Sequence, residues 1–423
     1  MAASATVTTR AVETPVRQWM MVVLLWLAVL INYIDRGGLS VIAVPVMAEF
    51  HLSPTAMGAL LSSFFWSYSL LQIPAGYLID RYGLKWTYAA AFVTWSAGSA
   101  FSGLATSFTN LLACRVVLGA GEAAAQPASL SYIRSRFADS QRGLPTAFYL
   151  TGMDLGPAAG TFFGSVLLSW LGWRGMLLAL GLGCCVWLIP WILIAPSEKT
   201  APAAGVSAQS RIAVPWTFLL SRPLVWGMIV GGFFYSYYWY FCLTWIPSYL
   251  MMDRKMTVLE MGAFASLPFL AKIPVVLIAG RLSDLFVRRT GREVFVRKSF
   301  VATGFTIASS ILLLLIVKSQ AGVMCVLITS LCGMAVGSAN YWALTQAITP
   351  PAMTGRIIGA QNMIGNLAGA FAPVMTGWLV TRTKGFSAAI WFAGAALIIA
   401  ALSYTLIVRE RPAQKLRTDL ELR

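Results

Sequence analysis

Six ionisable residues interrupt segments of the chain that are otherwise almost wholly apolar. They are three acids and three bases: Asp35, Arg36, Arg115, Glu122, Asp154 and Lys272. An isolated charge at the centre of a bilayer costs about 2.5–3.5 kcal/mol on the insertion scale, so such residues normally face a cavity or a partner. Buried carboxyl groups can exchange protons, and guanidinium groups can hold carboxylates. The chemistry indicated is therefore anion binding linked to proton movement.

Residue spacing suggests how four of these charges pair. Arg115 and Glu122 are seven residues apart, so on a helix they share a face about 10 Å apart along the axis. Counting from the ends of their apolar segments places Asp35 and Arg115 at similar depth in a core of about 30 Å. We expect these two to pair, which leaves Arg36 without a carboxylate at its level and free to hold a substrate carboxylate. The alternative is a static buried network of two acids and two bases.

The other intramembrane charges have less defined roles. Glu122 lies near mid-membrane in "GAGEAAAQP", and a carboxyl group buried among Gly and Ala is harder to ionise than one in water, which suits proton coupling. Asp154 and Lys272 could pair with each other or with a differently charged substrate. Lys272 could instead contact the second carboxylate of a dicarboxylate, or be structural.

Polar and aromatic residues supply weaker candidates for the lining of a cavity. Their side chains share helix faces with one another or lie in polar and aromatic stretches, although such aromatic density is more often an interfacial belt or core packing. The candidates are Tyr33, Tyr68, Gln72, Tyr237, Trp342, Asn362 and Asn366.

The composition indicates which elements must position these residues. Of 423 residues, 58% are apolar and only 11% charged, and the mean hydropathy is +0.74, which excludes an ordinary soluble protein. Segments long enough to span a bilayer number twelve in two sets of six. They lie at roughly 19–40, 55–79, 86–105, 109–133, 144–168, 175–195, 224–250, 258–280, 299–317, 321–348, 357–381 and 385–408.

We therefore predict an all-α membrane protein with twelve transmembrane helices in two pseudo-symmetric six-helix bundles. The predicted domains are an N-terminal tail (1–18), a first bundle (19–195), a linker (196–222), a second bundle (223–408) and a C-terminal tail (409–423).

The net charge of +16 reports topology. Most Lys and Arg residues fall in the tails and loops of one side, so both termini and the linker are expected in the cytoplasm. No basic run is interleaved with aromatics, and we expect no nucleic-acid partner.

Other kinds of site find little support. The six cysteines lie in apolar stretches without a CxxC motif, and His51 is the only histidine, so we expect no disulfide framework, no metal site and no cofactor. The sequence has no nucleophile–base pair and no phosphate loop, so we do not expect an enzyme.

Two loops repeat at matching places in the halves. "GYLIDRYGLKW" (76–86) follows the second span and "GRLSDLFVRRTGR" (280–292) follows the eighth. Each has Gly, three residues, then Asp and basic residues. We expect Asp80, Arg81 and Asp284 to act in a gate at the cytoplasmic side; the alternative is ordinary loop charge.

These features resemble the major facilitator superfamily. "NYIDRGGLSV", "SSFFWSYSLLQIPAGYLIDRYG", "RVVLGAGEAAAQP" and "LTWIPSYL" look more specifically like its anion:cation symporter branch, which includes bacterial galactonate, glucarate and hexuronate importers and vesicular organic-anion carriers. The resemblance implies that Arg36 contacts substrate, that Asp35 and Glu122 take part in proton coupling, and that Arg115 serves binding or coupling. Tyr33 and Tyr68 also lie in family motifs.

The expected function is proton-coupled import of a small organic anion by alternating access, the anion being a sugar acid (aldonate, aldarate or hexuronate). An organic-anion exchanger, or a carrier of a different (di)carboxylate, is the alternative, and a non-transporting sensor is less favoured. We expect a monomer surrounded by lipid in a bacterial inner membrane, because the first loop is short and the chain has no Asn-x-Ser/Thr acceptor.

Overall fold

The computed structural model describes residues 14–138, 141–196, 221–349 and 351–408, without the side chains of 351–356. The first half comprises α1 (Pro15–Val41), α2 (Ala43–Glu49), α3 (Pro54–Tyr82), α4 (Leu84–Gly103), α5 (Phe108–Glu122), α6 (Ala125–Arg136), α7 (Gly143–Cys184), η2 (Cys185–Trp187) and α8 (Leu188–Ile194). The second comprises α10 (Pro223–Met252), α11 (Val258–Thr290), α12 (Glu293–Ala308), η3 (Ser309–Leu315), α13 (Gln320–Ile348), α14 (Pro351–Thr383), α15 (Ser387–Leu402) and η4 (Ser403–Ile407).

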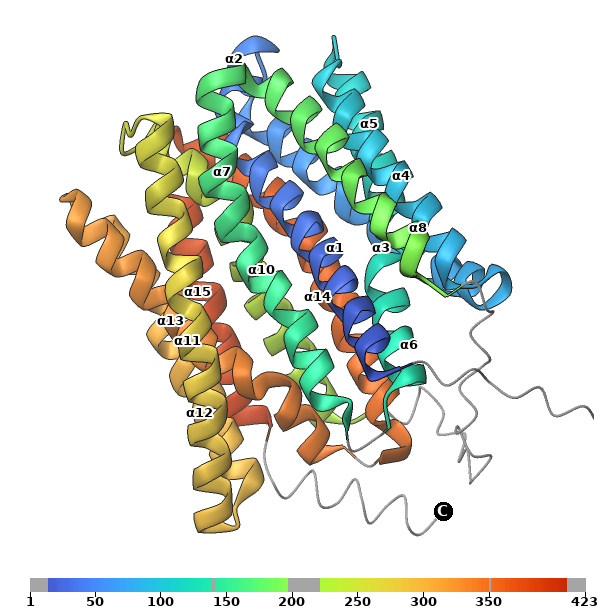
Figure 1. Ribbon diagram of the computed structural model, residues 1–423. Coiled ribbons are helices and arrows are strands. Elements are labelled where there is room, and N and C mark those ends of the chain that lie inside the picture. Colours follow the sequence, from blue (N-terminus) through green and yellow to red (C-terminus); the bar gives the residue numbers. More distant parts are fainter. Residues whose placement is uncertain (1–13, 139–140, 197–220, 350, 409–423) are drawn as a thin grey trace, which may run out of the picture.

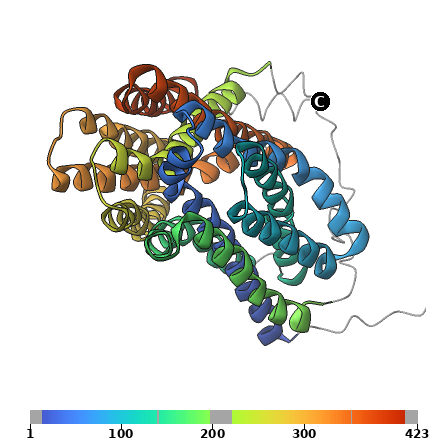
Figure 2. The same cartoon turned by 90° about the horizontal axis from the view of Figure 1, so that it is seen from above.

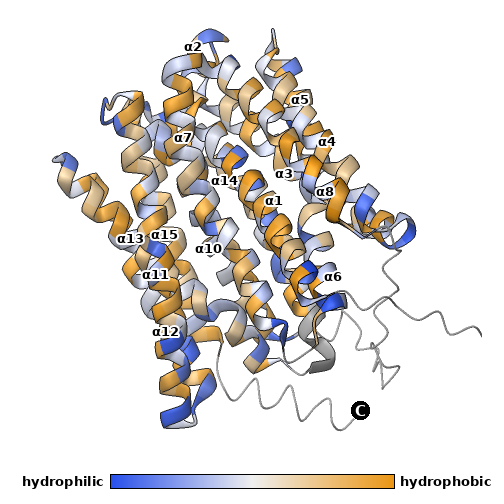
Figure 3. Ribbon diagram, viewed as in Figure 1, coloured by the Kyte–Doolittle hydropathy of each residue, from blue (hydrophilic) through white to orange (hydrophobic). Residues whose placement is uncertain are grey.

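The helices run side by side as membrane-spanning rods in two groups (Figures 1 and 2). Apolar residues dominate the middle of the rods, and the most hydrophilic residues gather at their ends (Figure 3). By length and composition alone, seven helical stretches of the described residues could cross a membrane, and one of them, Gly143–Ile194, contains two predicted spans. The remaining spans are α3, α4, α5 with α6, and α10. The predicted fold class of twelve helices in two bundles is confirmed.

Local sequence explains where the rods begin and break. Ser53 and Thr257 cap α3 and α11 through their side-chain oxygens. Span 4 breaks between Glu122 and Ala125, because Pro127 lacks an N–H for the carbonyl of Ala123 and its ring crowds that carbonyl. Spans 5 and 6 join within α7 through Gly172, whose φ of 66° is left-handed.

Three predicted boundaries differ clearly from the structure. Helix α12 begins at Glu293 instead of near 299, α14 begins at Pro351 instead of near 357, and the largest difference is at the end of α11. The eighth span was expected to end near residue 280, but α11 continues to Thr290. The charged motif there is helical, because Arg and Lys are good helix formers and the charges of the last turns can extend beyond the apolar core.

The two ends of the molecule differ in how the halves meet. We name them the α2 end and the α6 end after the short helices that lie there (Figure 1). At the α2 end, α3 packs on α14: Thr55 Oγ1 donates to Thr381 Oγ1 at 2.9 Å, and Ser62 Oγ donates to the Ala370 carbonyl at 2.5 Å. A Cβ added at Gly377 would overlap the backbone of Pro54, so only glycine permits this contact.

The second seam between the halves joins α7 and α11. A Cβ at Gly262 would overlap Ser165, so the helices touch there, also toward the α2 end. Toward the α6 end, by contrast, none of the described residues lies within 4 Å of a Cβ added at Gly76, Gly280 or Gly359. The halves are therefore tightly packed at the α2 end and leave open space along these helices at the α6 end.

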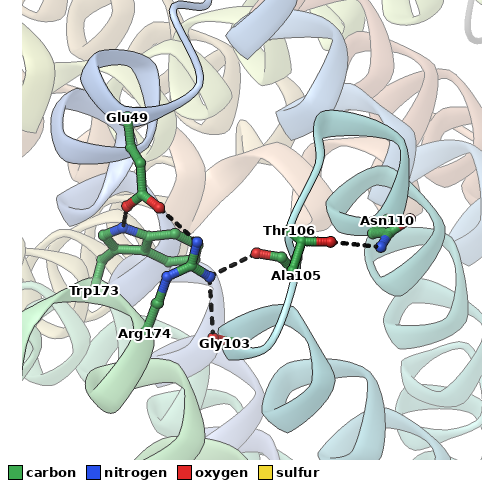
Figure 4. Close-up of polar contacts among 7 residues, drawn as sticks. All are labelled: Glu49, Gly103, Ala105, Thr106, Asn110, Trp173 and Arg174. Carbon is green, nitrogen blue, oxygen red and sulfur yellow. Dashed lines mark hydrogen bonds and ion pairs between the residues drawn. The ribbon is translucent and has the colours of Figure 1, made fainter.

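A group of hydrogen bonds, here called the polar clamp, joins helix α2, helix α7 and the α4–α5 loop at the α2 end (Figure 4). Arg174 donates to Glu49 at 2.5 Å and to the Ala105 carbonyl at 2.6 Å, and Trp173 Nε1 donates to the other Glu49 oxygen at 2.6 Å. The two hydrogen bonds hold the pKa of Glu49 below its usual value. The clamp fixes the short helix α2 against α7 and the α4–α5 loop.

The predicted tails and linker lie mostly outside the described residues, which leave out 1–13, 197–220 and 409–423. The proposed division into domains accordingly stays a prediction.

Candidate functional site

Asp35 and Arg36 point in different directions from α1. Successive residues on a helix are about 100° apart, and here that rotation directs Asp35 toward α4 and Arg36 toward α3 and the end of α5. Both side chains are buried.

Arg36 forms a buried ion pair with Glu122. Its Nε and Nη2 both donate to Glu122 Oε2, at 2.9 Å and 2.8 Å. Glu122 is fully buried, and its position at the break in span 4 directs its carboxylate at α1. The second oxygen, Oε1, is buried and makes no well-formed hydrogen bond among the described residues, although the Asn32 amide is close enough to interact with the carboxylate. That vacant acceptor is a place where a proton can be held.

Three aromatic rings enclose the Arg36 guanidinium. Its carbon lies 4.6 Å from the ring centroid of Tyr33, 4.8 Å from Phe64 and 4.6 Å from Tyr68. Arginine is suited to this cage because its flat group stacks on rings while its edges donate hydrogen bonds. The rings orient the guanidinium.

Asp35 and Arg115 face each other without a direct hydrogen bond. Asp35 Oδ1 accepts a hydrogen bond from Ser99 at 2.8 Å, and the charges of Asp35 and Arg115 attract each other. Nε and Nη2 of Arg115, and Oδ2 of Asp35, are buried without hydrogen-bond partners in the described part of the chain. Unmade bonds to a buried guanidinium are unfavourable, so Arg115 offers two donors to a ligand.

A small cavity of about 20 Å³ lies between these groups and the second half of the chain. It is lined by Arg36, Leu39, Leu61, Phe64, Phe65, Arg115, Leu118, Leu243 and Thr244. The last two belong to α10, so the cavity lies between the halves. Two guanidinium groups in an apolar wall suit a small anion, and the cavity must widen before the body of an organic anion can enter it.

This geometry corrects one expectation. Arg36 was expected to lack a carboxylate and Asp35 to pair directly with Arg115, but Arg36 pairs with Glu122 and it is Arg115 that has free donors. Axial depth counted along straight helices ignored the break after Glu122 and the direction of each side chain.

The other two intramembrane charges form a second ion pair. Lys272 Nζ on α11 lies 2.7 Å from Asp154 Oδ1 on α7, so the pair joins the two halves. Of the alternatives left open by the sequence, the structure therefore brings Asp154 and Lys272 together.

The weaker candidates divide into two groups. Tyr33 and Tyr68 touch Arg36. Tyr237 instead packs inside the second bundle, with its hydroxyl 3.2 Å from Thr376 Oγ1 and its ring 4.9 Å from Phe392. Tyr240, three residues along α10, makes the contact between the halves: its ring centroid lies 4.6 Å from that of Phe65. Its hydroxyl also interacts electrostatically with Arg36.

The remaining candidates are not brought to Arg36 by any contact of the described residues. Gln72 and Asn362 are half-buried, Asn366 is buried, and Trp342 is exposed and packs on Tyr341.

The predicted gate residues lie at the α6 end. Asp80 is exposed, and Arg81 donates to the Tyr77 hydroxyl at 3.0 Å on its own helix. Asp284 pairs with Arg297 of α12 at 3.3 Å, inside the second half. In this conformation these contacts are made within one half.

Sequence reasoning missed three contributors to the site. Ser99 lies in the small-residue stretch "SAGSAFSG", and Phe64 stands four residues before Tyr68, which puts both on one helix face. Asn32 precedes Arg36 by the same spacing and is buried with an unpartnered side-chain nitrogen in the described structure. The four-residue spacing was the available signal for Phe64 and Asn32.

No group of three or more potential metal ligands occurs among the residues that the structure describes.

Comparison with known proteins adds the family context. The model of the Major Facilitator Superfamily matches residues 25–373. The D-galactonate transporter of Escherichia coli O6:H1 is 30% identical over 418 residues, which cover 93% of this chain and 96% of the relative. The hexuronate transporter of Bacillus subtilis is also 30% identical, covering 95% of this chain and 97% of that protein.

A third relative and a solved structure complete the comparison. The probable galactarate/D-glucarate transporter GudP of Bacillus subtilis is 28% identical, covering 96% of this chain and 94% of that protein. A bacterial homolog of the human lysosomal transporter Spinster, crystallised in an inward-facing and occupied conformation, superposes with a TM-score of 0.74 at 19% identity, covering 97% of this chain and 98% of that one. That structure supports the fold.

Proposed function

The chain belongs to the Major Facilitator Superfamily, and on that premise we propose that it is a proton-coupled symporter that imports a small organic anion, a sugar acid. It is an integral membrane transporter and not an enzyme. Relatives named for galactonate, hexuronate and galactarate or glucarate support this class of substrate.

The observation that carries the proposal is the buried pair of Arg36 and Glu122 beside the cavity. Removing the charge of one partner of a buried pair leaves the other uncompensated, which is strongly unfavourable. When Glu122 takes a proton, Arg36 therefore needs a new anion, and a substrate carboxylate supplies it. Binding of proton and substrate favour each other, which is what coupling requires.

Asp35 and Arg115 offer a second set of groups with the same logic. Arg115 lines the cavity, and its two free donors suit a carboxylate or hydroxyl of the substrate. A proton on Asp35 would strengthen that interaction, because it removes the nearest competing negative charge.

The difference between the two ends supports alternating access. The positive loops favour a cytoplasmic α6 end, so the open space there corresponds to release into the cytoplasm. Rocking the halves about the cavity would open the seams at the α2 end and close the α6 end. With this orientation the protein lies in a bacterial inner membrane, and both of its termini are on the cytoplasmic side.

Uptake into proteoliposomes under an imposed pH gradient tests the proposal. With D-galactonate, D-glucuronate and galactarate as probes, an inward proton gradient should drive accumulation by the wild-type protein. Glu122→Gln should abolish accumulation but keep counterflow, because a neutral side chain cannot release a proton. Glu260→Gln is the matched control, since Glu260 is exposed and glutamine also serves in its capping box.

Two results would overturn the proposal. Wild-type protein that exchanges anions but ignores the pH gradient is an exchanger. Wild-type protein that binds an anion without any flux is a sensor.

A further inference from the structure

The ion pair of Asp154 and Lys272 has no part in the mechanism so far. It lies on the α7–α11 seam, on the side of the Gly262–Ser165 contact that faces the α6 end. It is therefore placed where the two halves begin to separate.

A contribution to stability alone does not explain why a buried ion pair is present here. The Lys272 side chain is only 5% exposed, and a buried ion pair is commonly no more stabilising than apolar residues of the same volume. Charges retained inside a membrane usually serve a ligand or ion pathway.

The Lys272 ammonium group is positioned by three elements. Asp154 comes from α7, Trp239 of α10 places its ring 4.1 Å from Nζ, and Lys272 itself is on α11. The Asp154 side chain is 29% exposed, so it is the accessible partner. An anion that reaches the pair can therefore take the place of Asp154 on Lys272.

This pair lies near the first one. The Tyr33 ring lies on the Arg36 guanidinium, and α7 meets Tyr33 at Gly156, two residues beyond Asp154. A close approach of helices holds this arrangement, because a Cβ at Gly156 would overlap Tyr33. One short molecule lying along Tyr33 can meet both cations.

The two pairs have the same form: a buried base, an acid from another helix and aromatic rings on the base. We propose that Lys272 is a second anion-binding residue, so that the substrate is a dicarboxylate, such as an aldarate, held by Arg36 at one carboxylate and by Lys272 at the other. Asp154 is the counterion that Lys272 exchanges for the substrate. This inference rests on the proposed function and specifies its substrate class.

Binding of two matched sugar acids to the purified full-length protein tests it. D-galactonate has one carboxylate and galactarate has two, and isothermal calorimetry measures both affinities. Asp154 is partly exposed and regains water when a substrate carboxylate replaces it on Lys272. The second charged hydrogen bond of galactarate, worth about tenfold or more in affinity, should therefore make wild-type protein bind galactarate at least about tenfold more tightly.

The decisive variant is Lys272→Met combined with Asp154→Asn, which removes both charges and leaves neither buried alone. It should lose the preference for galactarate while its affinity for D-galactonate stays the same, and that binding also shows that it folds. Lys272→Arg should keep the preference. Lys318→Met, at the α2 end beyond α12, is the control for loss of a lysine.

Equal wild-type affinity for the two acids, or a preference that survives in the double variant, would overturn the inference. D-galactonate binding and proton-driven uptake without any preference leave the proposed function standing. Absence of binding and uptake of both acids refutes the proposed function itself.

Discussion

At the scale of single residues, the site depends on the shape of the Arg36 side chain as much as on its charge. Three rings stack around a flat guanidinium while two of its N–H groups meet one carboxylate oxygen. A lysine would keep the charge but lose the stacking and the second hydrogen bond.

We expect Arg36→Ala to abolish uptake and Arg36→Lys to weaken substrate affinity by about tenfold to a hundredfold, the worth of charge-assisted hydrogen bonds. Initial uptake rates across a substrate series give KM and the maximal rate. Arg382→Lys is the control, because Arg382 also lies over a ring, Trp378, but at the α2 end. Full uptake by Arg36→Ala would show that another group holds the substrate.

The sequence identified the charged residues of the site but assigned partners imperfectly. A charge in an apolar segment can be recognised without a structure, because placing a charge inside the membrane is costly and therefore rare. The partner of a buried charge cannot be recognised in this way. Whether Arg36 pairs with Glu122 depends on the direction of its side chain and on the helix break that Pro127 causes. Tyr237 and Tyr240 are three residues apart, so their side chains leave the helix only about 60° apart, and the sequence does not tell which of them meets the other half.

At the scale of elements, short segments at the ends of the long helices hold neighbouring helices together. Helix α2 has seven residues, too few to be stable alone. The clamp of Glu49 with Trp173 and Arg174 holds it in place (Figure 4).

Because these hydrogen bonds lower the pKa of Glu49, the clamp stabilises the fold above the ordinary pKa of a glutamate. That contribution is lost as the pH falls through the lowered value. Glu49→Gln should lower the melting temperature by about one degree at neutral pH, since the groups are half exposed. The difference from wild type should vanish in acid. Thermal unfolding at several pH values measures it, and a difference that does not change with pH would refute the role of ionisation.

At the scale of the whole molecule, the α3–α14 seam decides which end can close. Gly377 lies against the Pro54 backbone, whereas a Cβ at Gly359, on the same helix, would meet no atom within 4 Å in the part of the chain that the structure describes. The two glycines form a matched pair.

We expect Gly377→Leu to keep the α2 end from closing and to abolish uptake, while Gly359→Leu interferes less in this conformation. A cysteine placed at Thr55 should react faster with a membrane-impermeant maleimide in the Gly377→Leu background, after subtraction of labelling without that cysteine. Unchanged labelling together with normal uptake would show that the seam tolerates the side chain.

The fold itself was largely predictable. Twelve apolar segments, split six and six, follow from hydropathy because the bilayer demands long apolar helices. The conformation does not follow, since one sequence must support closure at either end. Nor did the sequence show that α11 extends to Thr290, because charged helix ends carry no hydropathy signal.

The balance of three acids and three bases inside the membrane has an electrical consequence. Their formal charges cancel, and if each carboxylate of the substrate arrives with one proton, the loaded carrier is neutral as well. Membrane voltage does work only on net charge that moves, about 2.3 kcal/mol per elementary charge per 100 mV. Transport by a carrier that is neutral both empty and loaded is electroneutral, so its rate does not depend on the membrane potential. Its uptake is then driven by acidity alone and continues when the membrane potential has collapsed.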